Sequence, residues 1–495
     1  MTLLTSLGRA LAVDREQAQR ITTVRHLHIS ATPLVFVPLK MAGEASAPMA
    51  AMIGTDRSEP RLLVVAQPRN RDQRFAFAHH LARLLFAELT PKVAHQPPAP
   101  GQSADGRRRC ADAPQIWVPN RAGVEFVRML GRSTRFRRTA GPWRVPANVP
   151  RMGKWLTFYA DRFQHPGSSL LVPATAALSA HWATGQSHEE DEHLGTILAW
   201  LDTGEHGTGS DAALAAEDPV DHPPAGPATD PTFDNTVLAP LIRRYHENVS
   251  SRAECARVEA RIESALRGQL IGTWHMVWRA IDVLASLDPG SHVAERWGDD
   301  LDAFTRTAEW IENSPAAQPK RDAAVTAAKR LYELERAHAR YEAQRAFDDP
   351  LVMAEARMVG EAFAGTVTAA EPNRRVGRSL RPLITVETTD QVRLTAGEER
   401  LCSPTRIRQK AELLSVSELR GGLEVVLELS EGMGRGPEPE PGSVPEVGEQ
   451  VCYSRLTTKI RPMPQFPGRA DTPWTHGGPP ADYVPTDEDA VEEWQ

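Results

Sequence analysis

The amino-acid sequence predicts a multidomain α+β fold: an N-terminal mixed α/β region, a central long-helix bundle and a C-terminal small antiparallel β-barrel or sandwich. Length favours several domains, because 495 residues exceed the roughly 100–200 of a typical domain. Apolar residues recur every three or four positions in the middle of the chain and alternate with polar residues near its end. The composition, 41% hydrophobic and 24% charged, is typical of a protein that buries sizeable cores.

Residues 1–92 are expected to form a small α+β domain. Short apolar runs bounded by Pro, Gly and Asp predict strands, namely RHLHIS, TPLVFVPLKM, PMAAMIG and RLLVVAQP. The next segment, RDQRFAFAHHLARLLFAEL, has apolar residues at helical spacing. Residues 93–112 are rich in Pro, Gly and Ser and predict a linker.

The next two segments differ sharply in charge. Residues 113–202 predict a basic mixed, mostly helical region. Residues 203–232 predict an acidic disordered linker, because they are rich in Pro and Gly and belong to a stretch, 187–235, with twelve acids and no Lys or Arg.

Residues 233–370 predict a helical bundle or stalk. Ser251 and Glu254 have the spacing of a capping box, and a regular apolar stripe follows up to Leu284. Gly268 and Gly272, four apart, favour close approach of another backbone or a kink. Residues 380–460 alternate with period two and predict the β-barrel or sandwich, and 461–495 form a Pro-rich acidic tail. In outline, 233–460 resembles the accessory stalk and barrel of some nucleic-acid helicases, without their ATP-binding motifs.

The stretch SHEEDEHLGTILAWL, residues 187–201, combines histidines and carboxylates and raises the question of a metal site. Zinc-binding histidines on a helix stand four apart, whereas His188 and His193 stand five apart and diverge by about 140°. Ser187 and Glu190 instead match a capping box ahead of an apolar stripe. The pattern therefore predicts a helix start, and no metal site.

Most familiar catalytic motifs are missing. The chain has no GxxxxGK[ST], GxSxG, kinase or deaminase motif, and we predict no cofactor. Its four cysteines are widely spaced and form no CxxC, which favours reduced thiols and a cytoplasmic location. No run of about 18 apolar residues occurs, so no membrane partner is expected.

The strongest functional signal is a basic block. Residues 107–154 contain twelve basic residues and two acids, a net charge of +10, with aromatic residues interleaved. Arginine contacts phosphate and aromatic rings stack on unpaired bases, so the block predicts binding of single-stranded or deformed nucleic acid. The candidate residues are Arg107, Arg108, Arg109, Arg128, Arg132, Arg135, Phe136, Arg137, Arg138, Trp143, Arg144, Arg151 and Lys154.

Three functions remain open on the sequence. The first is a non-catalytic adaptor or accessory protein for nucleic-acid metabolism, with protein partners at the long helices or the C-terminal tail. The second is a divergent nuclease-like or other hydrolytic enzyme, with its site near His26, His28, His79 and His80 in the N-terminal region. The third is a protein-assembly module whose basic block meets an acidic protein partner.

Overall fold

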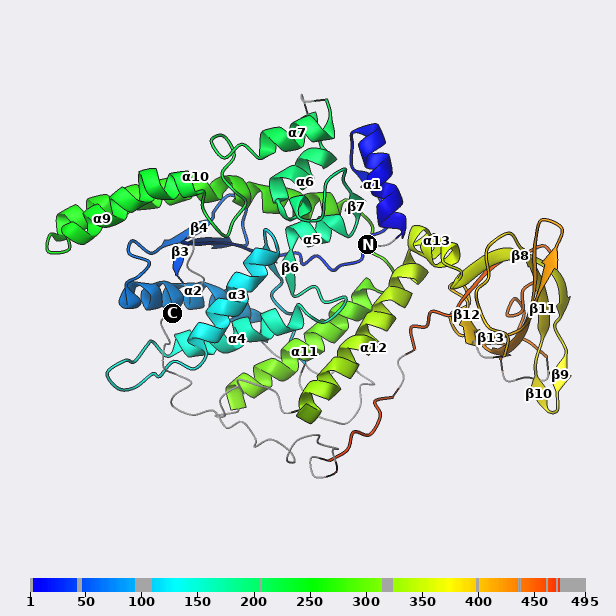
Figure 1. The fold of residues 1–495 in the computed structure, drawn as a ribbon. Coiled ribbons are helices and arrows are strands. Elements are labelled where there is room, and N and C mark those ends of the chain that lie inside the picture. The colour runs from blue at the N-terminus through cyan, green and yellow to red at the C-terminus, as the bar shows by residue number, and fades with distance from the viewer. Residues whose placement is uncertain are drawn as a thin grey trace.

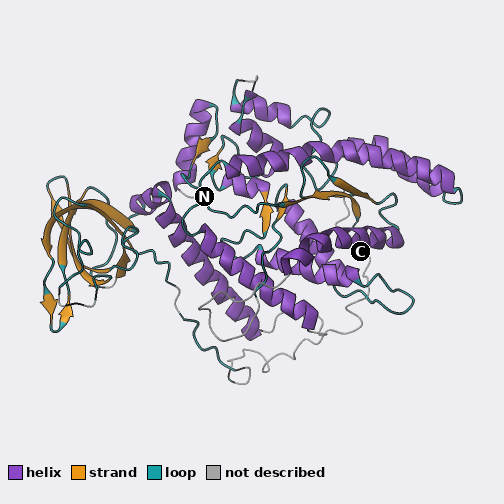
Figure 2. Cartoon of the chain, turned by 180° about the vertical axis from the view of Figure 1, so that it is seen from behind, coloured by secondary structure: helices purple, strands orange, loops and turns teal. Residues whose placement is uncertain are grey.

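The computed structural model describes residues 3–41, 47–93, 109–204, 207–313, 324–397, 400–434, 436, 438–459, 462–468 and 471. An α/β body is followed along the chain by a β unit that stands to one side of it (Figures 1 and 2). The mixed α/β class predicted from the sequence is therefore confirmed.

A five-stranded mixed sheet lies at the centre of the body. Its strands are β2 Leu34–Lys40, β3 Pro48–Gly54, β4 Arg61–Val64, β5 Ile116–Val118 and β6 Leu171–Pro173. They lie in the order β4-β3-β2-β5-β6; β4, β3 and β2 are antiparallel neighbours, whereas β5 and β6 run parallel to β2. Residues 1–92 and 113–202, expected as separate regions, thus contribute to one sheet.

The two faces of the sheet carry separate cores, because successive side chains of a strand point to opposite sides. Leu34 and Phe36 of β2 belong to one core, which includes α2 Arg71–Val93, α3 Arg121–Thr134, α4 Asn148–Arg162 and α11 Val293–Asn313. Val35 and Val37 belong to the other, with α5 Ala174–Ser179, α6 Leu194–Leu201 and α10 Arg252–Ala285. Burial on both faces explains why these strands are apolar almost throughout.

The long helices α10 and α11 are therefore layers against the sheet, whereas the sequence predicts that residues 233–370 form a bundle or stalk. α10 packs on β2, β3 and β4, and α11 packs on α4 beneath the opposite face. An apolar stripe shows that a helix face is buried but does not show what covers it. Gly268 and Gly272 lie on the exposed side of α10, and no heavy atom lies within 4 Å of a Cβ placed on either. The expectation of a close backbone approach there is wrong.

Residues 25–30, expected as a strand, form no strand; only an isolated bridge joins Arg25 to Pro289. Side chains take the place of a neighbouring strand. The amide of Gln115 accepts from the N–H of Ser30 at 2.9 Å and donates to the carbonyl oxygen of His28 at 2.6 Å. These two backbone groups are therefore hydrogen-bonded without a strand ladder.

The acidic segment 203–232, expected as a disordered linker, folds onto the body over most of its described length. It contains α7 Gly209–Ala216, which packs on α6, and Ala225, which is buried in the core beside α10. Lys40 at the end of β2 donates its N–H to the carbonyl oxygen of Pro227 at 2.7 Å. Three short helical elements then lead to α10: α8 Pro231–Phe233, the π-helical turn Asp234–Leu238 and α9 Ala239–Glu247.

The capping box predicted at residues 187–190 is present, but it does not begin the α-helix. Ser187 Oγ accepts from the N–H of Glu190, and Glu190 accepts from the N–H of Ser187. Only a 3₁₀ turn, Glu190–Glu192, follows. α6 begins at Leu194, with the ring of His193 accepting from the N–H of Thr196. The carboxylate-rich turn thus precedes the helix.

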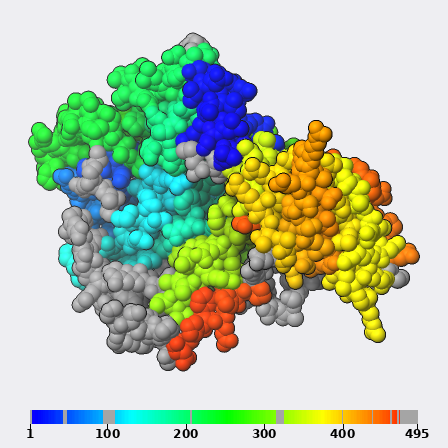
Figure 3. Space-filling model, turned by 45° about the vertical axis from the view of Figure 1, so that its right-hand side comes forward, coloured from blue at the N-terminus to red at the C-terminus, as the bar shows by residue number. Residues whose placement is uncertain are grey.

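The remaining elements join the body to the C-terminal unit. α12 Ala324–Asp348 leads into α13 Pro350–Met358, which packs beside the N-terminal helix α1 Leu3–Arg15 (Figure 3). A two-stranded pair of β1 Gln19–Arg20 and β7 Trp182–Ala183 lies next to α1.

The C-terminal unit is a six-stranded antiparallel sheet whose strands close into a barrel in the order β11-β14-β13-β12-β15-β8. The strands are β8 Ala362–Glu371, β11 Leu383–Thr388, β12 Arg400–Cys402, β13 Lys410–Leu419, β14 Gly422–Glu431 and β15 Gln450–Ser454. A small hairpin, β9 Arg375–Val376 and β10 Ser379–Leu380, extends from it. The unit begins before residue 380, because β8 pairs with both β11 and β15.

Candidate nucleic-acid interface

The predicted basic block centres on α3, α4 and the loop that joins them. Asn120 caps α3 by accepting from the N–H of Gly123 at 3.1 Å, and the apolar face of the helix enters the core under the sheet. Two glycines let α3 and α4 approach closely. A Cβ at Gly131 would lie 2.9 Å from the backbone N of Thr157, and one at Gly153 would lie 2.6 Å from Cα of Arg135. This close contact fixes where the loop leaves α3.

The loop, residues 135–147, has a defined path beyond the helices (Figure 1). The N–H of Val145 donates to the carbonyl oxygen of Arg138 at 2.8 Å, and the N–H of Arg144 donates to that of Gly141 at 3.3 Å. Gly141 has φ +84°, a left-handed conformation that favours glycine. Val145 is buried and anchors the end of the loop where the chain returns to the core. The turn between these anchors holds Trp143 outward, with 71% of its surface exposed.

Arginines contact the rings of Trp143 in the loop and of Phe75 in α2. The guanidinium of Arg71, at the start of α2, lies 5.7 Å from the ring centre of Trp143 and donates to the carbonyl oxygen of Trp143 at 2.8 Å. It also lies 4.6 Å from the ring centre of Phe75, which Arg137 approaches at 5.6 Å. Cation–π contacts of this kind orient a guanidinium without neutralising its charge. The cluster therefore keeps its positive charge.

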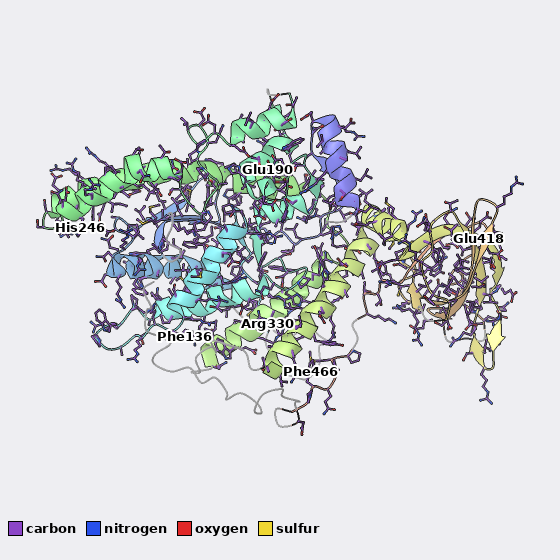
Figure 4. All side chains as sticks on the ribbon, viewed as in Figure 1. Phe136, Glu190, His246, Arg330, Glu418 and Phe466 are labelled. Carbon is purple, nitrogen blue, oxygen red and sulfur yellow. The ribbon has the colours of Figure 1, made fainter. Side chains whose placement is uncertain are left out.

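Some of the predicted residues gather at this loop. Arg132 lies in the last turn of α3 and Arg135 is the residue that caps its end; the guanidinium of Arg135 lies 4.6 Å from the ring centre of Phe136. Phe136 lies at the end of the α3–α4 pair in Figure 4. Arg138 and Arg144 are exposed. We call these residues, together with Arg71, the loop surface: Arg71, Arg132, Arg135, Phe136, Arg137, Arg138, Trp143 and Arg144.

The other predicted residues that the structure describes lie outside the loop surface and contact other parts of the protein. Arg109 bonds to the carbonyl oxygen of Gly298 and to Asp302 on α11. Arg128 pairs with Glu125 one helical turn away. Arg151 lies over the ring of Phe86 and 4.0 Å from Glu312, and Lys154 lies over the ring of Trp310. Arg107 and Arg108 lie outside the described residues.

The charge balance of the loop surface is strongly positive. Residues 132–147 contain five arginines and no acid. Asp72, which is exposed, lies 3.4 Å from Arg71. Arg132 and Arg144 make no ion pair with any residue in the described ranges. The surface thus presents several guanidinium groups and an exposed indole to solvent.

Sequence reasoning missed Arg71. The spacing of Arg71 and Phe75, four apart at a helix start, was available as a signal for their contact. The approach of Trp143, 72 residues away, was not, because it depends on how the loop folds back on α2.

The four histidines proposed for an enzymatic site do not form one cluster. His26 packs against His181, His28 stacks on Trp297, and His79 Nδ1 lies 2.8 Å from the side-chain oxygen of Asn148. Within the ranges that the structure describes, no three His, Cys, Asp or Glu side chains gather closely enough to hold a metal ion.

Comparison of the chain with protein-family models, with curated proteins and with solved structures found no match. Among the helices in the described parts of the chain, none has the length and apolar character needed to cross a bilayer.

Proposed function

We propose that this protein binds single-stranded or deformed nucleic acid through the loop surface and acts as an adaptor or accessory protein in nucleic-acid metabolism. The observation that carries the proposal is the exposed ring of Trp143, which lies beside the guanidinium of Arg71 and within residues 132–147, a segment with five arginines and no acid. A base stacks on an exposed aromatic ring, and guanidinium groups contact the phosphates on either side.

The hydrogen bonds of the loop support this function. The backbone hydrogen bonds at Val145 and Arg144, and the contact of Trp143 with Arg71, hold the ring in place before any ligand arrives. A prearranged surface loses less conformational entropy on binding than a mobile one. The stacking of one base on Trp143 would contribute about 1–3 kcal/mol.

The test uses the full chain and a single-stranded oligonucleotide of mixed sequence, with binding followed by fluorescence anisotropy over a range of salt concentrations. Arg138→Glu with Arg144→Glu should weaken binding at least tenfold. If two phosphate contacts are lost, the slope of log affinity against log salt should fall by about 1.4, at about 0.7 for each contact. Trp143→Ala should weaken binding with little change in that slope.

The matched control is Arg243→Glu with Arg261→Glu, which makes the same change of charge at exposed positions of α9 and α10. Equal losses in both double variants would show that net charge alone drives binding, and would contradict the proposal. A poly-glutamate chain serves as the acidic-protein probe. If it binds the loop surface as tightly as the oligonucleotide does, the assembly-module function replaces the proposed one.

A further inference from the structure

A cavity of about 350 Å³ lies between the end of α4, α11 and α12, away from the loop surface. Its lining is unusually rich in arginine: Arg162, Arg296, Arg306, Arg336 and Arg340. The acids that line it are Asp299, Asp302 and Glu333. Figure 4 shows the neighbouring Arg330 on α12, with Phe466 of the C-terminal segment near the start of this helix.

Two of the lining acids are already paired. Asp299 accepts from Arg340 at 2.8 Å, and Asp302 lies 2.8 Å from Nε of Arg109, which is outside the lining. Arg162 is likewise satisfied by Asp300, at 2.7 Å. Arg306 and Arg336 have no ion pair with any residue in the described parts of the chain, and Glu333 is the remaining acid in the lining. Arg296 and Arg340 also have carboxylate partners outside the lining, Asp348 at 4.0 Å from Arg296 and Glu295 beside Arg340. The lining guanidinium groups without an ion pair in the described structure are therefore those of Arg306 and Arg336.

Two guanidinium groups of the lining also have hydrogen-bonding capacity to spare. Arg296 is 6% exposed and donates to the side-chain oxygen of Gln344 and to the carbonyl oxygen of His26, both at 3.0 Å. Its Nε, and the buried Nε of Arg336, have no hydrogen-bond acceptor among the described residues. A guanidinium only donates, so such groups call for an acceptor-rich, negatively charged ligand.

We propose that this cavity binds a phosphomonoester of about the size of a mononucleotide. Guanidinium groups reach the cavity from α4, α11 and α12, and donors from several sides suit the tetrahedral oxygens of phosphate better than a planar carboxylate. The volume lies in the range of about 300–1,000 Å³ that is typical of small-molecule sites. Tyr341, Pro166 and Met463 supply less polar surface for the rest of the ligand.

Gly167 shapes the same cavity. It has φ +79°, and a Cβ there would lie 2.7 Å from the side chain of Arg296 and 2.9 Å from the ring of Tyr341. Glycine therefore lets these two side chains approach, and the guanidinium of Arg296 lies 5.2 Å from the ring centre of Tyr341.

Isothermal titration of the full chain with adenosine 5′-monophosphate, and with adenosine, tests the proposal. The nucleotide should bind and adenosine should bind at least tenfold more weakly. Arg306→Gln with Arg336→Gln should weaken nucleotide binding at least tenfold and lower the unfolding temperature only slightly, because neither arginine makes an ion pair in the described structure and Arg336 loses a contact with the ring of Tyr332. Arg243→Gln with Arg261→Gln is the matched control and should bind normally.

No detectable binding of the nucleotide, equal binding of adenosine, or an unaffected Arg306/Arg336 double variant would each overturn the proposal. Oligonucleotides with a 5′-phosphate and with a 5′-hydroxyl then separate two sources of the same group. If the protein prefers the 5′-phosphorylated oligonucleotide and the double variant loses this preference, the ligand is the phosphorylated end of a nucleic-acid strand. If both oligonucleotides bind equally, the ligand is a free nucleotide. Because Arg138 and Arg144 lie outside the cavity, failure here leaves the loop-surface experiment unaffected.

Discussion

The backbone N–H of His26 donates a hydrogen bond to Nε2 of His181 across 3.0 Å. The other ring nitrogen of His181, Nδ1, lies 2.7 Å from the carbonyl oxygen of Ala177, which can only accept. Nδ1 therefore carries the proton, Nε2 carries the lone pair, and the ring is neutral. A second proton on Nε2 would face the N–H of His26 and break the contact.

This arrangement predicts a loss of stability in acid. Burial lowers the pKa of His181 from 6.5 to about 3. Between these values the unfolded chain binds a proton that the folded chain does not, so the free energy of unfolding falls as the pH drops from 6.5 towards 3. His181→Gln should reduce the slope of unfolding free energy against pH by up to about 1.4 kcal/mol per pH unit. Urea unfolding at a series of pH values measures this slope.

The wild-type slope has other contributors, because burial also lowers the pKa values of His28 and His165 to about 4. The slope of His181→Gln is therefore compared with that of a second histidine variant. His246→Gln, at an exposed position of α9, should leave the slope as it is in the wild type. A His181 variant with the same slope as this control would contradict the assignment of a neutral, buried ring.

Glycine substitutions at a close helix contact and at an exposed helix position should have opposite effects on stability. Gly153→Ala should destabilise the fold by about 1–3 kcal/mol, because the added methyl group meets the backbone of Arg135. Gly268→Ala on the exposed side of α10 should stabilise it by up to about 1 kcal/mol, because alanine is the better helix former and nothing lies within 4 Å. Chemical denaturation of both variants gives the comparison. Equal changes in stability would contradict the close packing of α3 against α4.

The buried pair of Arg162 and Asp300 predicts a large effect of neutralisation. Asp300 is fully buried and accepts from Arg162 and from the N–H of Ser169, both at 2.7 Å. Asp300→Asn should cost about 3–5 kcal/mol of stability, because it leaves a largely buried guanidinium without its counter-charge. Asp282→Asn removes an exposed pair with Arg57 and should cost about 0–1 kcal/mol. Denaturant unfolding measures both losses of stability. Similar losses for the two variants would contradict the difference between the buried and the exposed ion pair.

Two capping serines predict unequal losses: Ser187 belongs to a reciprocal capping box, whereas Ser251 accepts from the N–H of Glu254 and its own N–H donates to the carbonyl oxygen of Asn248. Ser251→Ala should destabilise the protein by about 1 kcal/mol, because Ser251 caps the 34-residue helix α10. Ser187→Ala should cost less, because Ser187 precedes only a three-residue 3₁₀ turn and α6 has its own cap at His193. Thermal unfolding of the two variants compares their losses of stability. A larger loss for Ser187→Ala than for Ser251→Ala would contradict the prediction.

Local patterns predicted several elements well. The apolar runs around β2, β3 and β4, the N-cap serine and apolar stripe of α10, and the alternating runs of β11, β13, β14 and β15 appear where the sequence indicates them. The run QVRLTAG, residues 391–397, forms no strand, and Glu254 does not bond back to Ser251 as a capping box would. These elements depend on neighbours within a few residues. The candidate site was predicted less completely, because a cluster of arginines in the sequence does not show which of them meet a carboxylate in the fold.

Arg128 and Arg132 illustrate the difference. Both lie on one face of α3, but only Arg128 has Glu125 one turn away, a pair that the sequence alone allows. The partners of Arg109 and Arg151 lie on α11, more than 150 residues further along the chain, and no local pattern indicates them. For the same reason Arg71 was missed and the cavity beside Arg306 and Arg336 was not foreseen.

The sequence by itself determined the helices and strands with a strong apolar period, their caps, and the concentration of arginine before Trp155. Only the tertiary structure decided that α10 and α11 cover opposite faces of one sheet, and which guanidinium groups remain free of carboxylates. The physical reason is range. Period and capping depend on bonds within one or two turns, whereas burial and ion pairing depend on which distant segments the fold brings together.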